Sequence, residues 1–242
     1  MRRLQTALAF TLLSALAGCS TGSSNQARPT GASTTEGTPS NSPSAQPRPE
    51  EPAIDFRRPP AEDLRSPDTY SVRMETTAGV ITLEVTRSWA PNGADRFYTL
   101  VRSGYFTDIA MFRVISGFMA QGGLHGDPAV NRVWRNRRIQ DDPVTQQNTR
   151  GMVTFAMAGA NTRTTQFFIN LVDNRRLDSM GFAPFGRITD MSTVDALHSG
   201  YGEGAPRGRG PDQARIGSAG NTYLRADFPE LDYIQSASIV EG

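Results

Sequence analysis

One arginine lies inside an apolar run of the sequence, where its charge needs an explanation. This residue is Arg113, within the run Met111–Ile115. A guanidinium group is costly to bury unless acceptors take its N–H groups, so we expect Arg113 to be paired or functional. Gln121 follows on the next apolar run and is a candidate partner, because its amide oxygen can accept a hydrogen bond.

A second run, from Gly151 to Asn170, ends with two large aromatic residues beside two amides. Phe167 and Phe168 are flanked here by Gln166 and Asn170. Taken alone, runs of this composition are core strands more often than binding sites. A functional interpretation of either run therefore needs a longer motif.

Other side chains with catalytic chemistry are scarce. The chain has two histidines, one cysteine and no lysine, so it offers neither a Schiff-base lysine nor the lysine of a phosphate-binding loop. His125 and Asp127 lie in a glycine-rich turn and make a weak metal-site candidate, whereas His198 is expected to end a helix. We therefore predict no metal site and no cofactor.

The basic residues form one local cluster, in which Arg132, Arg135, Arg137 and Arg138 surround Trp134. Proteins that bind nucleic acid usually carry a strong positive field over one face. The formal net charge of this chain is only +1. We therefore expect no nucleic-acid partner.

The first 19 residues have the pattern of an export signal. A positively charged start, Met1–Arg3, precedes an apolar stretch, Leu4–Leu16, that is too short to span a bilayer. The stretch ends in Leu-Ala-Gly-Cys, which resembles the lipobox of bacterial lipoproteins. The resemblance implies that Cys19 is acylated and anchors the mature protein to a membrane on its extracytoplasmic side. The alternative is an ordinary signal peptide with a coincidental cysteine.

Residues 20–67 have the composition of a tether. They are dominated by Ser, Thr, Gly and Pro, and they hold more than half of the chain's 16 prolines. Such a segment has too few large apolar residues to form a core, so we predict that it is disordered. The globular domain is then predicted at 68–242, which is long enough to fold without a disulfide.

The hydrophobic pattern of this domain predicts many short strands. Alternation over 70–75 and 80–85 predicts a hairpin of half-buried strands, and Pro91–Val101 has the pattern of a helix that Gly104 ends. The other predicted elements are strands at 111–115, 118–121, 152–157, 167–171, 183–188 and 233–240, a short helix at 191–198, and a loop at 200–220. This order favours an antiparallel barrel or sandwich.

The two apolar runs resemble the two signature segments of cyclophilins. The first, Met111–Gly123, is close to the family wording F-H-R-V-I-P-G-F-M-x-Q-G-G, and the second contains the family's Q-F-F-I at Gln166–Ile169. The similarity continues through 173–178 and 182–188 and covers residues 70–240. It implies a mainly β fold, a closed eight-stranded antiparallel barrel capped by two α-helices.

The same resemblance implies a peptidyl-prolyl cis-trans isomerase, or rotamase, acting on proline-containing segments of exported proteins and assisting their folding. Arg113 would donate to the prolyl nitrogen or the adjacent carbonyl, and Gln121 would help to hold the guanidinium. The substrate-binding residues would be Phe118, Met119, Ala156, Met157, Ala158, Gln166, Phe168, Leu177 and Phe182. We expect a monomer.

Some positions depart from the family pattern. Phe112 and Ser116 stand where the family usually has histidine and proline, and Phe182 replaces the histidine of the eukaryotic type. Arg176 occupies the position of an aromatic residue that favours cyclosporin binding. We therefore expect weak affinity for cyclosporin.

Two further interpretations stay open from the sequence. One is a non-catalytic module that binds proline-containing peptides, or acts as a chaperone, on the same scaffold. The other is a structural or adhesive surface lipoprotein, which would leave Arg113, Gln121 and Phe168 without a role. A binding groove would not need an arginine at the prolyl nitrogen, so the sequence favours the isomerase.

Overall fold

The computed structural model describes residues 54–240 of the chain. The predicted signal peptide 1–19, the lipobox cysteine Cys19 and residues 20–53 of the predicted tether lie outside the described residues. Within 54–240, no helix is both long and apolar enough to cross a bilayer.

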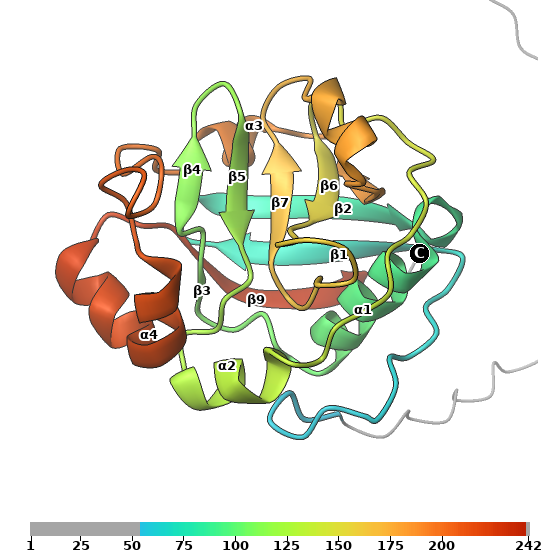
Figure 1. Cartoon of the computed structure of the whole chain (residues 1–242), viewed down its shortest axis with the longest axis horizontal. Helices are drawn as coiled ribbons and strands as arrows, with labels where there is room; N and C mark the ends of the chain where they lie inside the picture. The colour runs from blue at the N-terminus through green and yellow to red at the C-terminus, as the bar shows by residue number, and fades with distance from the viewer. Residues whose placement is uncertain (1–53, 241–242) are drawn as a thin grey trace, which may run out of the picture. The chain divides into compact units, whose positions relative to one another are not determined.

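The described part of the chain folds around one antiparallel sheet (Figure 1). Its strands follow one another in space in the order β3-β9-β1-β2-β8-β6-β7-β5-β4. Their bounds are β1 Thr69–Thr76, β2 Gly79–Thr86, β3 Ile109–Ala110, β4 Arg113–Ile115, β5 Met119–Gly122, β6 Met152–Phe155, β7 Phe167–Asn170, β8 Pro184–Ile188 and β9 Tyr233–Val240.

The prediction of a closed eight-stranded barrel is wrong in its count and its closure. The sheet has nine strands, and its two edge strands, β3 and β4, are not hydrogen-bonded to each other. Only Met111 and Phe112 separate these two strands along the chain. β3 pairs with β9 while β4 pairs with β5, and of the predicted strand 111–115 only Arg113–Ile115 forms a strand. The sheet is therefore a curled half-barrel.

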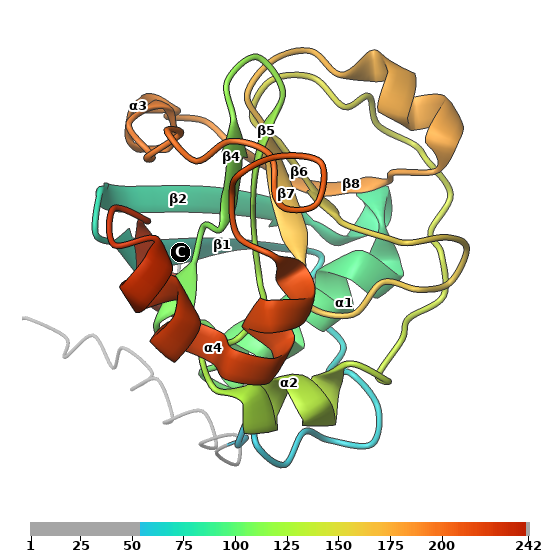
Figure 2. The same ribbon diagram turned by 60° about the vertical axis from the view of Figure 1, so that its left-hand side comes forward.

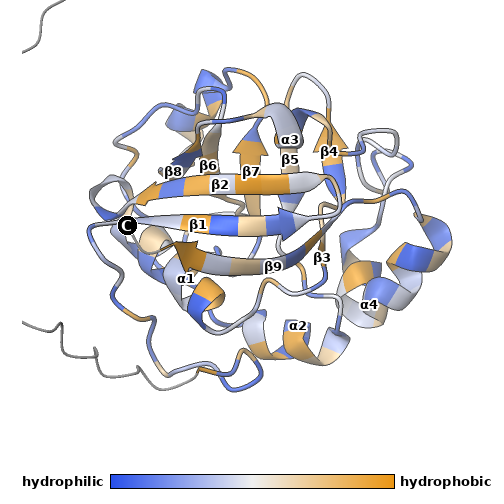
Figure 3. Cartoon of the chain, turned by 180° about the vertical axis from the view of Figure 1, so that it is seen from behind, coloured by the Kyte–Doolittle hydropathy of each residue, from blue (hydrophilic) through white to orange (hydrophobic). Residues whose placement is uncertain are grey.

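The first hairpin forms as its alternation predicts. β1 and β2 pair in register from Thr69 with Thr86 to Thr76 with Gly79, and alternate residues of both strands are buried. Polar and apolar residues follow one another along β1 (Figure 3). Val72 is fully buried on the inner face. This pattern is that of a strand with one face on the core and one face toward solvent.

Helix α1, Pro91–Arg102, covers one side of the sheet and supplies the centre of the core. Proline suits its first turn because the missing N–H would be unpaired there in any case. Phe97 on this helix packs against four aromatic rings, with centroid distances from 5.0 to 6.4 Å. Those rings are Phe106, Phe155, Phe167 and Phe185. This aromatic cluster joins α1 to strands β6, β7 and β8.

The described residues contain four α-helices where two were predicted. The three besides α1 are α2 Pro128–Trp134, α3 Ser192–Asp195 and α4 Gln213–Asp227, and two short 3-10 helices lie at Arg87–Trp89 and Arg175–Met180. Helix α4 begins inside the segment predicted as a loop, and glycines in that segment hid it. At Gly220 the chain has φ 57°, and a Cβ there would collide with the carbonyl oxygen of Gly126. Figure 2 shows α4 and α2 side by side below the sheet.

Residues 54–67, which the sequence predicts to be part of the tether, lie against the domain. Phe56 and Leu64 pack on the hydrophobic core. The Asp63 carboxylate accepts hydrogen bonds from the Nε of Arg96, a buried residue of α1, at 2.8 and 3.0 Å. The few apolar residues of this segment pack on the surface of the domain, and the composition of the segment does not predict that packing.

Candidate active site

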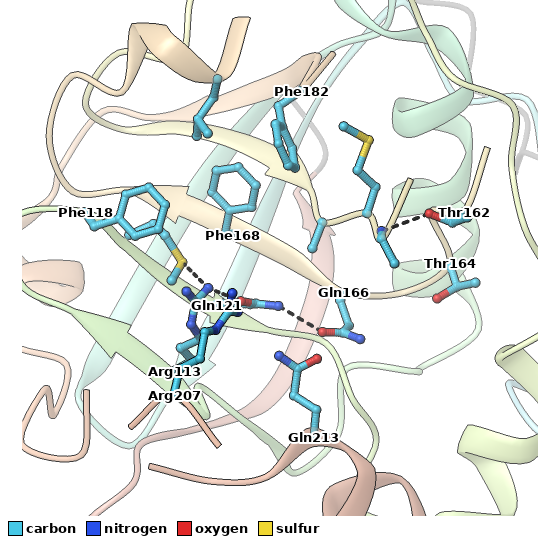
Figure 4. A pocket seen from close by; sticks show the side chains of 15 residues that line it. Arg113, Phe118, Gln121, Thr162, Thr164, Gln166, Phe168, Phe182, Arg207 and Gln213 are labelled. Atoms are coloured by element: carbon cyan, nitrogen blue, oxygen red, sulfur yellow. Dashed lines mark hydrogen bonds between the residues drawn. The ribbon is translucent and has the colours of Figure 1, made fainter. Parts of the chain in front are cut away.

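One cavity lies on the side of strands β4, β5 and β7 that faces away from the main core (Figure 4). Its lining residues come from these strands, from the loops after β6 and β7, and from the segment before α4. They are Arg113, Phe118, Met119, Gln121, Ala156, Met157, Ala158, Thr162, Thr164, Gln166, Phe168, Leu177, Phe182, Arg207 and Gln213. All eleven residues that the sequence suggested for catalysis and substrate binding therefore line a single cavity.

Strand register explains why three of these side chains meet. Arg113 on β4 pairs with Gln121 on β5, and Gln121 in turn pairs with Phe168 on β7. Residues directly opposite each other in an antiparallel ladder have side chains on the same face. Their neighbours Ala120 and Ile169 point to the opposite face and belong to the main core. A shift of one residue in either pairing would move these side chains out of the cavity.

The guanidinium group of Arg113 is held by hydrogen bonds on two sides. Its Nη1 donates to Oε1 of Gln121 at 2.9 Å, and the amide nitrogen of Gln121 donates to Oε1 of Gln166 at 2.9 Å. Its Nε and Nη2 donate to the two carboxylate oxygens of Glu203, both at 2.7 Å. The expected partner Gln121 is therefore in contact with the arginine. Glu203 is a partner that the sequence did not indicate.

The opposite end of the cavity is apolar. Met119, Phe168 and Leu177 form a buried cluster of their own, and Phe118 and Phe182 pack against it. The rings of Phe168 and Phe182 meet edge to face, with centroids 5.6 Å apart. An apolar hollow next to a fixed hydrogen-bond donor suits a small ring attached to a peptide backbone.

Two arginine side chains lie near the ring of Phe118, which lines the cavity. The guanidinium carbon of Arg113 is 5.9 Å from its ring centroid and that of Arg176 is 5.0 Å away. A cation over an aromatic face is attracted by the ring's quadrupole, so Arg176 covers Phe118 from the solvent side. The rim position that departs from the family pattern is thus filled by an exposed, charged side chain.

Two backbone N–H groups in the stretch after β6 donate hydrogen bonds to other groups of the protein. The N–H of Ala156 donates to the carbonyl of Gln166 at 2.9 Å, and the N–H of Ala158 donates to the hydroxyl of Thr162 at 2.9 Å. These two N–H groups are therefore not free for a bound peptide. Thr162 and Thr164 line the same side of the cavity.

Burial and charge set the protonation of two groups. The hydrogen bonds and the charge of Arg113 hold the pKa of the Glu203 carboxyl below its usual range, so Glu203 is an anion at neutral pH. Burial lowers the pKa of His125 to about 4, so this histidine is neutral there. His125 stacks on Phe56 away from the cavity, and 54–240 contain no cluster of three His, Cys, Asp or Glu side chains fit to hold a metal.

Sequence reasoning missed four lining residues and Glu203. Thr162 and Thr164 lie within the second signature segment and were passed over because the family wording leaves their positions open. Arg207 and Gln213 come from 200–220, whose Gly-rich composition carries no periodic signal. No local pattern marks a residue that reaches a site from 90 positions away, as Glu203 does.

Comparisons with known proteins agree with this geometry. The family described as "Cyclophilin type peptidyl-prolyl cis-trans isomerase/CLD" matches residues 71–220. A peptidyl-prolyl cis-trans isomerase named cyp18 from Streptomyces antibioticus is 36% identical over 152 residues, which cover 57% of this chain and 88% of that protein. A peptidyl-prolyl cis-trans isomerase of Helicobacter pylori is 32% identical over 129 residues, covering 53% of this chain and 79% of that protein.

Solved structures show the same fold. A cyclophilin type peptidyl-prolyl cis-trans isomerase of Cryptosporidium parvum superposes with a TM-score of 0.54 at 23% sequence identity, covering 72% of this chain and 99% of that chain. A second structure of the Cryptosporidium protein, obtained in the presence of the dipeptide Ala-Pro, has a TM-score of 0.53. The likeness extends over nearly the whole of those chains.

Proposed function

The chain belongs to the cyclophilin-type peptidyl-prolyl cis-trans isomerase family, and on this premise we propose that it isomerises X-Pro bonds in exported proteins and assists their folding. The observation that carries the proposal is the place of the Arg113 guanidinium, at the edge of the apolar hollow formed by Met119, Phe168 and Leu177. A proline ring in the hollow would bring its amide nitrogen toward the arginine.

The reaction needs no bond to be made or broken. Rotation about an X-Pro bond crosses a barrier of about 20 kcal/mol because the amide loses its conjugation, and uncatalysed isomerisation takes tens of seconds. A catalyst must bind the twisted amide better than either planar form. In the twisted state the prolyl nitrogen becomes pyramidal and can accept a hydrogen bond.

The proline ring is held by the apolar end of the cavity, formed by Phe118, Met119, Phe168, Leu177 and Phe182. Arg113 donates to the prolyl nitrogen or to the adjacent carbonyl, and this bond strengthens as the amide twists.

Three other groups support this arrangement. Gln121 fixes the guanidinium through the contact between Nη1 and Oε1. Gln166 and the remaining backbone groups of the stretch Ala156–Ala158 bind the residues that precede the proline. No titration is required of any of these groups.

The experiment is a peptide isomerisation or proline-limited refolding assay with the purified protein and its Arg113→Ala variant. We expect the wild type to accelerate isomerisation and the variant to lose at least about a hundredfold in kcat/KM, the cost of removing one transition-state donor. The exposed Arg209→Ala change serves as a matched control and should leave the rate unchanged. A wild-type rate no faster than the uncatalysed rate would instead favour a non-catalytic module that binds proline-containing peptides, and equal accelerated rates for both proteins would remove Arg113 from its catalytic role.

We further propose that the enzyme works outside the cytoplasm as a monomer, tethered to a membrane through acylated Cys19. This rests on the sequence of residues 1–19, which lie outside the described part of the chain. Fatty-acid labelling of cells that express the wild type or Cys19→Ala tests the anchor. Label in the wild type and none in the variant is the expected result, and labelling of both would remove Cys19 as the anchor.

A further inference from the structure

The segment between α3 and α4 brings one carboxylate to the arginine of the site. Glu203 lies on this segment and accepts from the Nε and Nη2 of Arg113 with its two oxygens, both at 2.7 Å. Such paired contacts combine charge with a fixed planar geometry. The side chain of Arg113 is 15% exposed and that of Glu203 is 31% exposed, so water screens the pair only in part.

The loop is built to hold this carboxylate in place. The carbonyl oxygen of Glu203 accepts from the N–H of Gly210 at 2.8 Å, and its side-chain Oε1 accepts from the N–H of Gly204 at 3.0 Å. A Cβ on Gly208 would lie 2.1 Å from the Glu203 carbonyl oxygen, so the close return of the loop requires glycine there. Both the backbone and the side chain of Glu203 are thus positioned before any substrate binds.

The contact leaves the arginine able to act. Nη1 and Nη2 each carry a second N–H group beyond those that bind Gln121 and Glu203. The second N–H of Nη1 has only the weak sulfur acceptor of Met119, at 3.8 Å. Glu203 itself is not among the residues that line the cavity, so its carboxylate does not fill the space for the proline ring.

We propose that Glu203 is a positioning residue for the isomerase, which fixes the guanidinium of Arg113 in the orientation that the twisted prolyl amide requires. The inference rests on the proposed function. A free arginine side chain samples many rotamers and loses them when it binds. The loop at 200–212 imposes this order in advance, and such preorganisation speeds the reaction without adding a contact to the substrate.

The first test is kinetic and uses the full protein. We expect Glu203→Ala to lower kcat/KM by about tenfold to about a hundredfold, mainly through kcat, because a misplaced guanidinium costs transition-state stabilisation more than peptide binding. Glu203→Gln keeps one acceptor oxygen and should recover part of the loss. Arg209→Ala, an exposed change on the same loop, should have no effect.

The second test is spectroscopic and does not depend on activity. In nitrogen-15 NMR spectra, the Nε–H of Arg113, assigned by its absence in Arg113→Ala, should exchange slowly with water in the wild type and rapidly in Glu203→Ala. An Nε–H exchange rate that is the same in the wild type and Glu203→Ala would overturn the proposal. So would a kcat/KM of Glu203→Ala that is unchanged or increased, or a fall in kcat/KM of the same size in Arg209→Ala. If the wild type shows no isomerase activity, the proposed function fails while the NMR result still reports on the contact.

Discussion

Arg113 and Gln121 face each other across the β4–β5 ladder, and Oε1 of Gln121 accepts from Nη1 of Arg113 at 2.9 Å. The amide nitrogen of Gln121 then donates to Gln166, which lines the same cavity. These two hydrogen bonds fix the orientation of the Gln121 amide, whose oxygen faces the arginine and whose nitrogen faces Gln166. Gln121 thus connects the proposed hydrogen-bond donor to the residues expected to bind the peptide before the proline.

The first prediction concerns this connection. Gln121→Leu removes an acceptor from a partly buried guanidinium and a donor from Gln166, so we expect kcat/KM to fall by about tenfold or more. The peptide isomerisation assay measures this. Gln140→Leu, a matched change at an exposed position, should leave kcat/KM unaltered. A Gln121→Leu enzyme with the wild-type rate would mean that the amide does not hold the arginine.

The second prediction separates binding from chemistry. Phe182 packs edge to face on Phe168 and is only partly buried. Removing its ring should therefore leave the fold of the Phe182→Ala variant intact. The lost apolar contact is worth about 1–2 kcal/mol, and we expect KM for a proline peptide to rise by about tenfold with a smaller change in kcat. Trp89→Ala, at the short helix Arg87–Trp89, is the matched aromatic control. A fall in kcat alone would place Phe182 outside the ring-binding surface.

The third prediction concerns stability. Asp63→Ala leaves the guanidinium of Arg96, which is 5% exposed, without its carboxylate, and losing one member of a buried pair costs about 3–5 kcal/mol. The carbonyl oxygens of Arg137 and Thr164 still accept hydrogen bonds from Arg96, so the loss of unfolding free energy should lie at the lower end of this range. Denaturant unfolding measures it. Asp68→Ala, which removes a 92% exposed carboxylate, should change stability by less than about 0.5 kcal/mol.

The same contact predicts where the folded domain begins. A chain that starts at Asp68 lacks Asp63, Leu64 and Phe56, so it should be less stable than a chain that starts at Ile54. Thermal unfolding of the two chains compares them directly. Equal unfolding temperatures would show that residues 54–67 add nothing to the domain.

The fourth prediction concerns pH. Arginine does not titrate near neutrality, and the pKa of Glu203 is held below its usual range, chiefly by the hydrogen bond from Arg113. A lowered carboxyl pKa means that the contact is intact above that pKa and is lost as the pH falls through it. We therefore expect kcat/KM to be nearly constant from roughly pH 6 to pH 8 and to decline only in acid. A steep change with a midpoint of about 6.5, in the range of histidine, would contradict this mechanism.

The fifth prediction concerns an inhibitor. Arg176 stands over Phe118 at the rim, in the position where the family resemblance expects an aromatic residue. We expect weak inhibition by cyclosporin and a clear gain in affinity for Arg176→Trp, since an aromatic side chain would restore an apolar wall. Inhibition titrations of the two enzymes measure the difference. Equally weak inhibition of both would shift the cause to another part of the rim.

Local patterns in the sequence predicted most of the sheet. Strands β5, β6, β7 and β8 lie within one residue or two of the predicted runs, and β9 matches 233–240. These strands have strong alternating or continuous apolar patterns, which a short window captures. Helix α4 was not predicted because Gly217 and Gly220 interrupt its hydrophobic pattern. The prediction of a closed barrel was wrong because the edge strands β3 and β4 pair with different partners.

From the sequence alone, the resemblance to the cyclophilin segments predicted most of the residues that line the cavity, and the strand register places Arg113, Gln121 and Phe168 on one face of adjacent strands. Only the tertiary structure decided what surrounds them. Glu203 reaches Arg113 across 90 positions, and Asp63 reaches Arg96 across 33. Neither contact can be predicted from the periodicity or composition of the sequence. Each one depends on where a loop or terminal segment packs against a surface that distant strands and helices form.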